Sequence, residues 1–294
     1  MIRVKKIAHA SYEMPDVEQQ AEYYANVLGM TVAAREKDAV FLANTVDHHS
    51  VVLRKGEQAQ CARVGFQLGE ADDLDAFEKQ VQGHGIKTAR KKDPEPSITD
   101  LLTFEDPKGT VMEVFKRADF SHQKFQAKGI VPHKLGHVAF HVTDVKHVTK
   151  FYCDVLGFRE SDWMADFFSF LRCGPDHHTI NLMQTGSNRH FHTAFELRDW
   201  GHMQTACDFL STNGYKLLWG PGRHGIGHNL FTYHRSPAGF ITELFAELDR
   251  MNEDLGYFEP RPWHRDNPQR PKVWGKDPSA SNLWGIMPGD EMHH

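Results

Sequence analysis

The stretch KLGHVAFHVTDVKHVTKFYCDVLGF (residues 134–158) decides the fold, because the chain carries its pattern a second time as KIAHASYEMPDVEQQAEYYANVLGM (residues 6–30). Four residue pairs keep one constant separation along the chain: His9 with His137, Asp16 with Asp144, Tyr24 with Tyr152, and Gly29 with Gly157. Three further blocks match in the same order: DHHSVVL (47–53) with DHHTINL (176–182), VGFQL (64–68) with TAFEL (193–197), and MEVF (112–115) with TELF (242–245). Chance could produce one matching block but not four in order, so the sequence indicates a tandem duplication.

Each copy predicts the same order of elements. Residues 134–142 alternate as a strand, and a helix follows with Asp144 as its N-cap and Gly157 at its C-terminus. Short strands are expected near FFSFLRC (167–173) and TINLMQ (179–184). The order then recurs, from FHTAFEL (191–197) through a helix near 202–210 to the strands NLFTYH (229–234) and FITELFAE (240–247).

We therefore expect an α+β protein with two tandem domains, at residues 1–120 and 130–249. Each domain should consist of two β-α-β-β-β modules whose curved mixed sheet surrounds a concave site. Residues 250–294 lie outside the repeat and include the Pro- and Trp-containing segment PRPWHRDNPQRPKVWG (260–275). We expect these residues to form an irregular tail that could act as a lid.

Composition excludes several classes of protein. The length of 294 residues suits two domains, and 40% hydrophobic with 25% charged residues suits packed cores. A net charge of −5 argues against a nucleic-acid binder. The four cysteines form no CxxC pair, which fits a reducing cytosol, and we find no signal peptide or apolar membrane span. A cytoplasmic enzyme is expected, and its 20 histidines indicate metal binding or acid–base chemistry.

One segment of the second copy narrows the interpretation. GPGRHGIGHNLFTYHRSPAGFITE (220–243) places His224, Tyr233 and Glu243 in order, with Pro237 and Gly239 between the last two. Together with LGHVAFHVTD (135–144), HFHTAFEL (190–197) and the four modules, it resembles the type I extradiol ring-cleavage dioxygenases of the vicinal-oxygen-chelate superfamily, that is, enzymes of the catechol 2,3-dioxygenase and homoprotocatechuate 2,3-dioxygenase kind. The resemblance covers residues 4–248.

The resemblance implies that His137, His192 and Glu243 bind a metal ion. Two imidazoles and one carboxylate form the facial triad of non-haem Fe(II), and Mn(II) uses the same ligands. A lone strand histidine is more often structural, but Glu243 stands between Ile241 and Phe245, where a carboxylate is rarely buried without a partner or a metal. His190 is an alternative to His192, which we prefer because it directly precedes the TAF segment.

The resemblance also assigns the remaining chemistry. His178 would act as the acid–base group, and His224 and Tyr233 would hydrogen-bond the oxygens of a catechol that shares the metal with dioxygen. Both oxygen atoms would enter a muconic semialdehyde-type product, and the enzyme would be a homo-oligomer, a tetramer in the family. Two simpler interpretations stay open: His178 as an inherited residue that His49 matches, and Tyr233 as a half-buried strand aromatic.

The first copy departs from this pattern. It keeps His9 and Glu113, but Arg63 stands at the place of His192, and Thr103 or Phe104 stands near the place of Tyr233. We expect that this domain has lost the site and serves as a scaffold. His48 and His49 would then be structural.

The substrate is expected to be catechol or a neutral alkyl- or aryl-substituted catechol. In relatives that bind a carboxylated ring, the arginine that contacts the carboxylate aligns with Trp219 of this chain. Trp219 would instead supply an apolar wall. The tail segment DNPQRPKVWG (266–275) resembles the lid of homoprotocatechuate-type enzymes, so Arg265 and Arg270 could instead reach the pocket and bind a carboxylated ring. The alternatives to a dioxygenase of this kind are another metal-dependent enzyme of the superfamily, such as a glyoxalase-like isomerase or a hydroxyphenylpyruvate-type dioxygenase, and a non-enzymatic aromatic-binding module.

Overall fold

The structure, a computed structural model, describes the chain except residues 46, 121–127, 260–269, 286, 290–291 and 293–294. The first domain contains two successive β-α-β-β-β modules, as the sequence predicts. Module one comprises β1 (Val4–Met14), α1 (Val17–Asn26), β2 (Thr31–Glu36), β3 (Ala39–Ala43) and β4 (Val51–Lys55). Module two comprises β5 (Gln60–Leu68), α2 (Leu74–Gly83), β6 (Ala89–Glu95), β7 (Ile98–Glu105) and β8 (Val111–Phe115).

The second domain repeats this order. Module three comprises β9 (Lys134–Val142), α3 (Val145–Leu156), β10 (Arg159–Met164), β11 (Phe168–Arg172) and β12 (Ile180–Gln184). Module four comprises β13 (Arg189–Glu196), α4 (Trp200–Thr212), β14 (Leu217–Arg223), β15 (Leu230–Arg235) and β16 (Ile241–Ala246). The expected arrangement of two tandem domains and four modules is thus confirmed.

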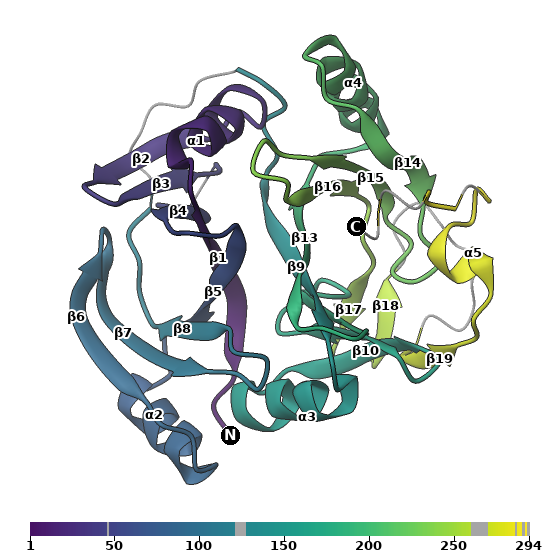
Figure 1. Cartoon of the computed structure of the whole chain (residues 1–294). Coiled ribbons are helices and arrows are strands. Elements are labelled where there is room, and N and C mark those ends of the chain that lie inside the picture. The colour runs from purple at the N-terminus through teal and green to yellow at the C-terminus, as the bar shows by residue number, and fades with distance from the viewer. Residues whose placement is uncertain (46, 121–127, 260–269, 286, 290–291, 293–294) are drawn as a thin grey trace.

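Each domain forms one curved mixed sheet, with its helices on the outside (Figure 1). The strand orders are β2-β3-β4-β1-β5-β8-β7-β6 and β14-β15-β16-β13-β9-β12-β11-β10-β19. In both sheets the two module-opening strands pair antiparallel at the centre, and each pairs in parallel with the last strand of its own module. This register puts the first and last strands of a module side by side, and in the second domain these strands carry His137, His192 and Glu243.

The predicted boundaries of the helix over 145–156 are confirmed by its caps. The Asp144 side chain accepts a hydrogen bond from the backbone N–H of His147, and Gly157 ends the helix with φ of 75°. The apolar residues on its inner face pack on the sheet: Val148, Tyr152 and Val155 are all buried. These local signals fix where β9 ends, and therefore where His137 lies.

The two domains share one hydrophobic core. Tyr23 of α1 places its hydroxyl 2.6 Å from His234 Nε2 and donates to Thr242 Oγ1 at 3.1 Å, across the domain boundary. In the opposite direction, the hydroxyl of Tyr152 on α3 donates to the buried Asp106 carboxylate at 3.0 Å. The first helix of each domain, α1 or α3, is thus hydrogen-bonded to the other domain.

The tail is more regular than the sequence indicated. Its described part contains the hairpin β17 (Arg250–Asn252) and β18 (Tyr257–Glu259), then β19 (Lys272–Trp274) and the short helix α5 (Pro278–Ser281). β19 pairs in parallel with β10 and so covers the edge of the larger sheet, whose unpaired backbone groups would otherwise face solvent. None of the described helices is long and apolar enough to cross a membrane.

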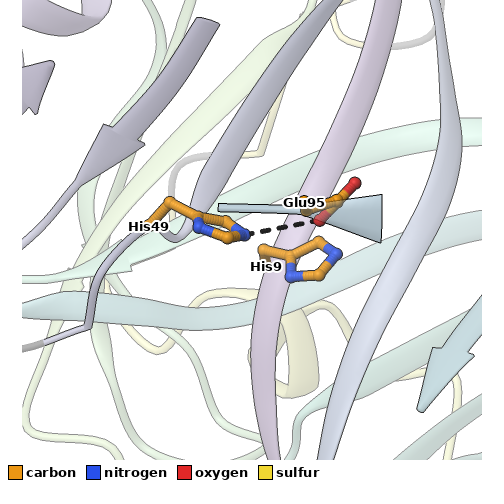
Figure 2. Close-up of side chains that lie close together, drawn as sticks. All are labelled: His9, His49 and Glu95. Atoms are coloured by element: carbon orange, nitrogen blue, oxygen red, sulfur yellow. Dashed lines mark ion pairs between the residues drawn. The ribbon is translucent and has the colours of Figure 1, made fainter. Parts of the chain in front are cut away.

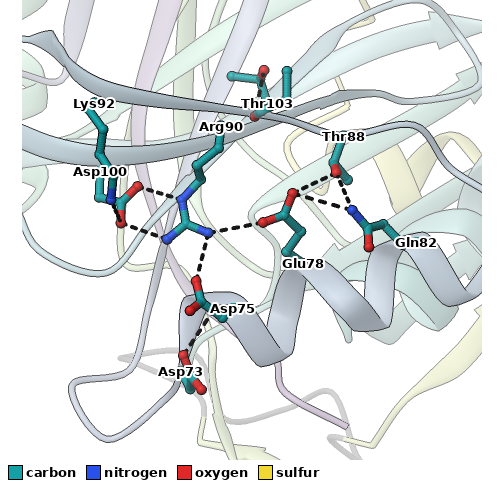
Figure 3. A network of polar contacts seen from close by, with 10 residues as sticks. Asp73, Asp75, Glu78, Gln82, Thr88, Arg90, Lys92, Asp100 and Thr103 are labelled. Atoms are coloured by element: carbon teal, nitrogen blue, oxygen red, sulfur yellow. Dashed lines mark hydrogen bonds and ion pairs between the residues drawn. The ribbon is translucent and has the colours of Figure 1, made fainter.

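The edge strand β6 of the first sheet is held by a polar network around Arg90 (Figure 3). Its guanidinium donates to both oxygens of Asp100, at 2.5 and 2.6 Å, and to Asp75 and Glu78 at 3.0 and 3.1 Å. These bonds tie β6 to α2 and β7. They hold the beginning of β6, whose last residue is Glu95.

Candidate metal centre

Three adjacent strands bring His137, His192 and Glu243 together. Ala194 of β13 stands opposite His137 on β9 and opposite Glu243 on β16. His192 lies two residues from Ala194, so its side chain leaves the same face of the sheet. All three side chains are buried. The order β16-β13-β9 therefore places three potential ligands on the concave face, although they are far apart in sequence.

The three donor atoms are spaced to hold a metal ion. His137 Nε2 lies 3.2 Å from His192 Nε2 and 3.0 Å from Glu243 Oε2, and the His192–Glu243 distance is 3.2 Å. Ligand bonds of about 2.0–2.2 Å to one octahedral ion require donor separations of roughly 3 Å. Such close convergence of two imidazole nitrogens and a carboxylate oxygen fits a cation at their centre, so the residues present suit the facial triad.

The electrostatics of the three groups agree with ligation. Burial alone would raise the pKa of Glu243, but His137 and His192 hold this pKa well below its ordinary value, so the carboxylate is ionised. Burial lowers the pKa of His192, which favours the neutral imidazole that a metal needs. The second oxygen of Glu243 accepts a hydrogen bond from Asn229 Nδ2 at 3.1 Å. Asn229, which sequence reasoning missed, thereby turns the other oxygen toward the histidines.

His178 lies beside this centre, and a chain of hydrogen bonds through His177 to Asp162 positions it. Its ring centroid is 4.4 Å from that of His137. His178 Nδ1 is 3.0 Å from His177 Nδ1, and His177 Nε2 is 3.1 Å from the Asp162 carboxylate. Because a carboxylate accepts, Asp162 places the His177 proton on Nε2, and His177 Nδ1 must then accept from His178 Nδ1–H. The lone pair of His178 is consequently on Nε2, away from His177.

His224 and Tyr233 form the opposite wall. His224 Nδ1 donates to the Ser281 carbonyl at 2.5 Å, so its Nε2 accepts from the Tyr233 hydroxyl at 3.0 Å. Burial lowers the pKa of His224 to about 4 and raises that of Tyr233, so both groups are neutral at pH 7. Trp219 stacks on Tyr233, with ring centroids 5.5 Å apart and planes within 14°.

A cavity of about 270 Å³ is lined by the three potential ligands together with His178, Trp219, His224 and Tyr233. Its remaining lining is almost entirely apolar, and the described residues that line it include no lysine or arginine. The apolar lining residues are Met164, Phe167, Phe168, Phe170, Met183, Phe191, Ile226, Ala280, Met287, Pro288 and Met292. Arg270 is exposed and is not among the lining residues, whereas Arg265 lies outside the described residues.

The remaining histidines of interest lie elsewhere. His190 is not among the residues that line this cavity, and its Nε2 is 2.9 Å from Thr193 Oγ1. In the first domain, His9 Nε2 lies 2.8 Å from Glu113 Oε2, while Arg63 approaches the other oxygen of Glu113 at 3.4 Å. The arginine therefore stands where the second domain has a histidine, and Thr103 occupies the position of Tyr233 in the strand register.

Comparisons with known proteins agree with this geometry. The family model described as "Glyoxalase/Bleomycin resistance protein/Dioxygenase superfamily" matches residues 6–114 and 134–244. Metapyrocatechase 2 of Cupriavidus necator is 26% identical, over 84% of this chain and 82% of its own. The iron-dependent extradiol dioxygenase of Rhodococcus jostii (strain RHA1) is 25% identical, over 93% and 97%. Among solved structures, the Mn(II)-bound glyoxalase from Novosphingobium aromaticivorans is 28% identical, with a TM-score of 0.87 over 99% of this chain and 94% of its own.

Proposed function

The chain belongs to the glyoxalase/bleomycin resistance protein/dioxygenase superfamily, and from this premise we propose that it is an extradiol dioxygenase that cleaves a catecholic ring with dioxygen. The observation that carries the proposal is the convergence of His137, His192 and Glu243 in one cavity with His178 and the His224–Tyr233 pair. Two relatives that span most of the chain are a metapyrocatechase and an iron-dependent extradiol dioxygenase, and they support the same reaction.

The ion held by His137, His192 and Glu243 would supply Lewis acidity and open coordination positions for the substrate and dioxygen. The protein residues do the rest. His224 and Tyr233 lie in hydrogen-bond contact with each other on one wall, where a catechol oxygen could bond to either group. Trp219 and the phenylalanines exclude water and orient the ring.

His178 provides the movable proton. Its free Nε2 lone pair can accept a proton from a catechol hydroxyl and later return it to a leaving oxygen, which is general base and then general acid catalysis. Burial lowers the pKa of His178 well below its ordinary value, so the resting group is the neutral base. Asp162 and His177 keep the ring in the orientation and tautomer that this role needs.

The cavity favours a neutral substrate. At about 270 Å³ it is slightly smaller than the roughly 300–1,000 Å³ that is common for ligand sites, so it suits a small substrate. Its described lining offers no cation to pair with a carboxylate substituent. A catechol with an alkyl or aryl substituent suits this lining better than one with an acidic side chain.

The test is anaerobic loading with Fe(II), followed by oxygen uptake and visible absorbance with catechol, 3-methylcatechol, 2,3-dihydroxybiphenyl and 3,4-dihydroxyphenylacetate. We expect oxygen uptake together with a yellow ring-fission product, and loss of both in Glu243→Gln. Stoichiometric binding of catechols without oxygen uptake would refute an enzymatic role and favour an aromatic-binding module.

A glyoxalase-like isomerase is the second candidate, because a Mn(II)-bound glyoxalase has the same fold over nearly the whole chain. An isomerase of this kind rearranges its substrate without consuming dioxygen. Turnover of a thiol–oxoaldehyde adduct under nitrogen, with no oxygen uptake from catechols, would favour this alternative.

Three further features complete the proposal on the strength of the family resemblance. The ion is iron rather than manganese, which metal analysis of anaerobically purified protein would test. The enzyme assembles as a homotetramer, which light scattering would test. It works in the cytoplasm, which fractionation of the source cells would test.

A further inference from the structure

The first domain has a second cluster of ligand-type side chains, apart from the His137 centre. His9 of β1, His49 of the loop before β4, and Glu95 at the end of β6 each offer one ligand atom within 4.8 Å of the others (Figure 2). All three residues are buried, with 0%, 4% and 7% of their surface exposed. Two imidazoles and one carboxylate are the same donor set that the second domain uses.

Each residue of this cluster makes a hydrogen bond through one polar atom, while its other polar atom makes none. His9 Nε2 contacts Glu113 at 2.8 Å, His49 Nδ1 contacts His48 at 3.0 Å, and one oxygen of Glu95 accepts from Arg54. Within the described part of the chain, His9 Nδ1, His49 Nε2 and Glu95 Oε2 have no hydrogen-bond partner. His49 Nε2 and Glu95 Oε2 face each other at 3.6 Å, an ion-pair contact that is longer than an ordinary hydrogen bond (Figure 2). Buried polar atoms nearly always form hydrogen bonds, so three buried ligand-type atoms without one in a single cluster are consistent with a bound cation.

The cluster is rearranged rather than a decayed copy of the other centre. Only His9 corresponds to a proposed ligand of the second domain. His49 corresponds to His178, and Glu95 lies at the end of β6 as Arg223 does at the end of β14. Opposite His9 stands Gly65, where a Cβ atom would come within 2.3 Å of the imidazole; the residue opposite His137 is Ala194.

The glycine therefore lets the His9 ring lie against β5, a position that a side chain at residue 65 would deny it. Arg63 meanwhile donates to Glu113, the counterpart of Glu243, from the position that His192 has in the second domain. An ion pair thus stands where the second domain has two of its three potential ligands, and the His9–His49–Glu95 cluster lies toward β6.

The donor set selects the kind of ion. Imidazole nitrogens suit Zn²⁺ and other first-row transition ions rather than Mg²⁺ or Ca²⁺. Arg54 orients the Glu95 carboxylate, as groups behind a metal ligand commonly do, and leaves one oxygen to bind. The pairs Glu95–Arg54 and Glu113–Arg63 already balance their charges, so an ion here gains less attraction than it would beside Glu243, which bonds to the neutral Asn229.

We propose that His9, His49 and Glu95 form a second, structural metal site in the first domain, which takes Zn²⁺ or a similar divalent transition ion more weakly than the His137 centre binds its ion. In the order β2-β3-β4-β1-β5-β8-β7-β6, the site joins the central strand β1 to the edge strand β6. The ion would thus cross-link these two strands across the concave face of the curved sheet. The proposal is independent of the reaction at the other centre.

The test uses the full chain, in which the His137 centre of the second domain is disabled by His192→Ala and Glu243→Gln. After dialysis against Zn²⁺ and washing with a weak chelator, elemental analysis should find one zinc per chain. Adding Glu95→Gln should abolish this zinc, whereas Glu70→Gln, on an exposed surface glutamate, should retain it. Zn²⁺ should also raise the melting temperature of the disabled chain but not that of the chain that also carries Glu95→Gln.

Two outcomes overturn the proposal. The disabled chain could bind no zinc, a result that needs no variant of the first domain and holds even if Glu95→Gln fails to fold. Alternatively, the bound zinc could persist after Glu95→Gln in a chain whose circular dichroism is unchanged. Co²⁺ provides a second readout, because visible absorption bands of a bound ion should disappear with Glu95→Gln.

Discussion

Replacing Asp162 with Asn should lower kcat about 10- to 100-fold while metal content and KM stay nearly unchanged. Asp162 does not line the cavity, but it accepts from His177 Nε2 at 3.1 Å, from Trp274 Nε1 at 2.8 Å and from the Lys272 backbone N–H at 2.9 Å. An asparagine has one acceptor oxygen for these three donors and carries no charge. The His177 ring would lose the partner that fixes its tautomer, and through it the tautomer of His178.

The magnitude follows from the bond that is lost. A hydrogen bond to a charged group is worth about 1.5–3 kcal/mol, and about 1.4 kcal/mol corresponds to a tenfold change in population. The fraction of His178 with its lone pair on Nε2 should therefore fall by one to two powers of ten. Because this fraction limits proton transfer but not substrate binding, the loss should appear in kcat.

The assay is steady-state oxygen uptake with 3-methylcatechol, on samples whose iron content has been measured. Trp274→Phe is the matched control, because it removes one donor from the same carboxylate and leaves His177 in place; its kcat should be nearly unchanged. An Asp162→Asn enzyme with wild-type kcat, or one whose loss is explained by missing iron, would refute the role of the Asp162–His177–His178 chain.

Three further predictions concern other parts of the molecule. His178→Phe should keep its metal but lose about 10²–10⁴-fold in kcat, as expected for an acid–base group, and a wild-type rate would make the residue structural. Hydrogen bonds from Arg90 lower the pKa of Asp100 to about 2, so Asp100→Asn should destabilise the protein by at most about 1 kcal/mol at pH 7. The loss of unfolding free energy caused by Asp100→Asn should be largest above the unfolded-state pKa of Asp100, near 4. It should become smaller as the pH falls toward 2, which thermal melts at several pH values would measure. If Trp219 is an apolar wall, kcat/KM for 4-methylcatechol should exceed that for 3,4-dihydroxyphenylacetate, and a more than tenfold preference for the acid would contradict this.

The duplicated fold could be predicted because its signals are local and occur twice. Asp144 and Gly157 mark the ends of a helix wherever the rest of the chain lies, and alternation marks the strands. The candidate metal centre could be predicted in outline for a related reason. Once the modules are known, β9, β13 and β16 must be neighbours, and His137, His192 and Glu243 must share a face.

Other contacts gave no signal in the sequence. Asp162 reaches His177 only because β10 and the loop before β12 meet in space, and no spacing rule connects the two residues. Glu95 ends a hydrophilic edge strand, ARKKDPE (89–95), which has no apolar pattern to reveal an inward side chain. The repeated histidine pairs, His48–His49 and His177–His178, were a sequence hint that the two domains have similar polar clusters. In the structure, both pairs place their Nδ1 atoms 3.0 Å apart.

The central claim is that this chain inserts both atoms of dioxygen into a catecholic ring, and ¹⁸O₂ labelling tests it most directly. The iron-loaded enzyme should convert 3-methylcatechol into a ring-opened product in which mass spectrometry finds both labelled atoms, apart from any exchange with water. Glu243→Gln should form no such product. A ring that stays closed, or a product that carries no label when exchange is excluded, would contradict the account.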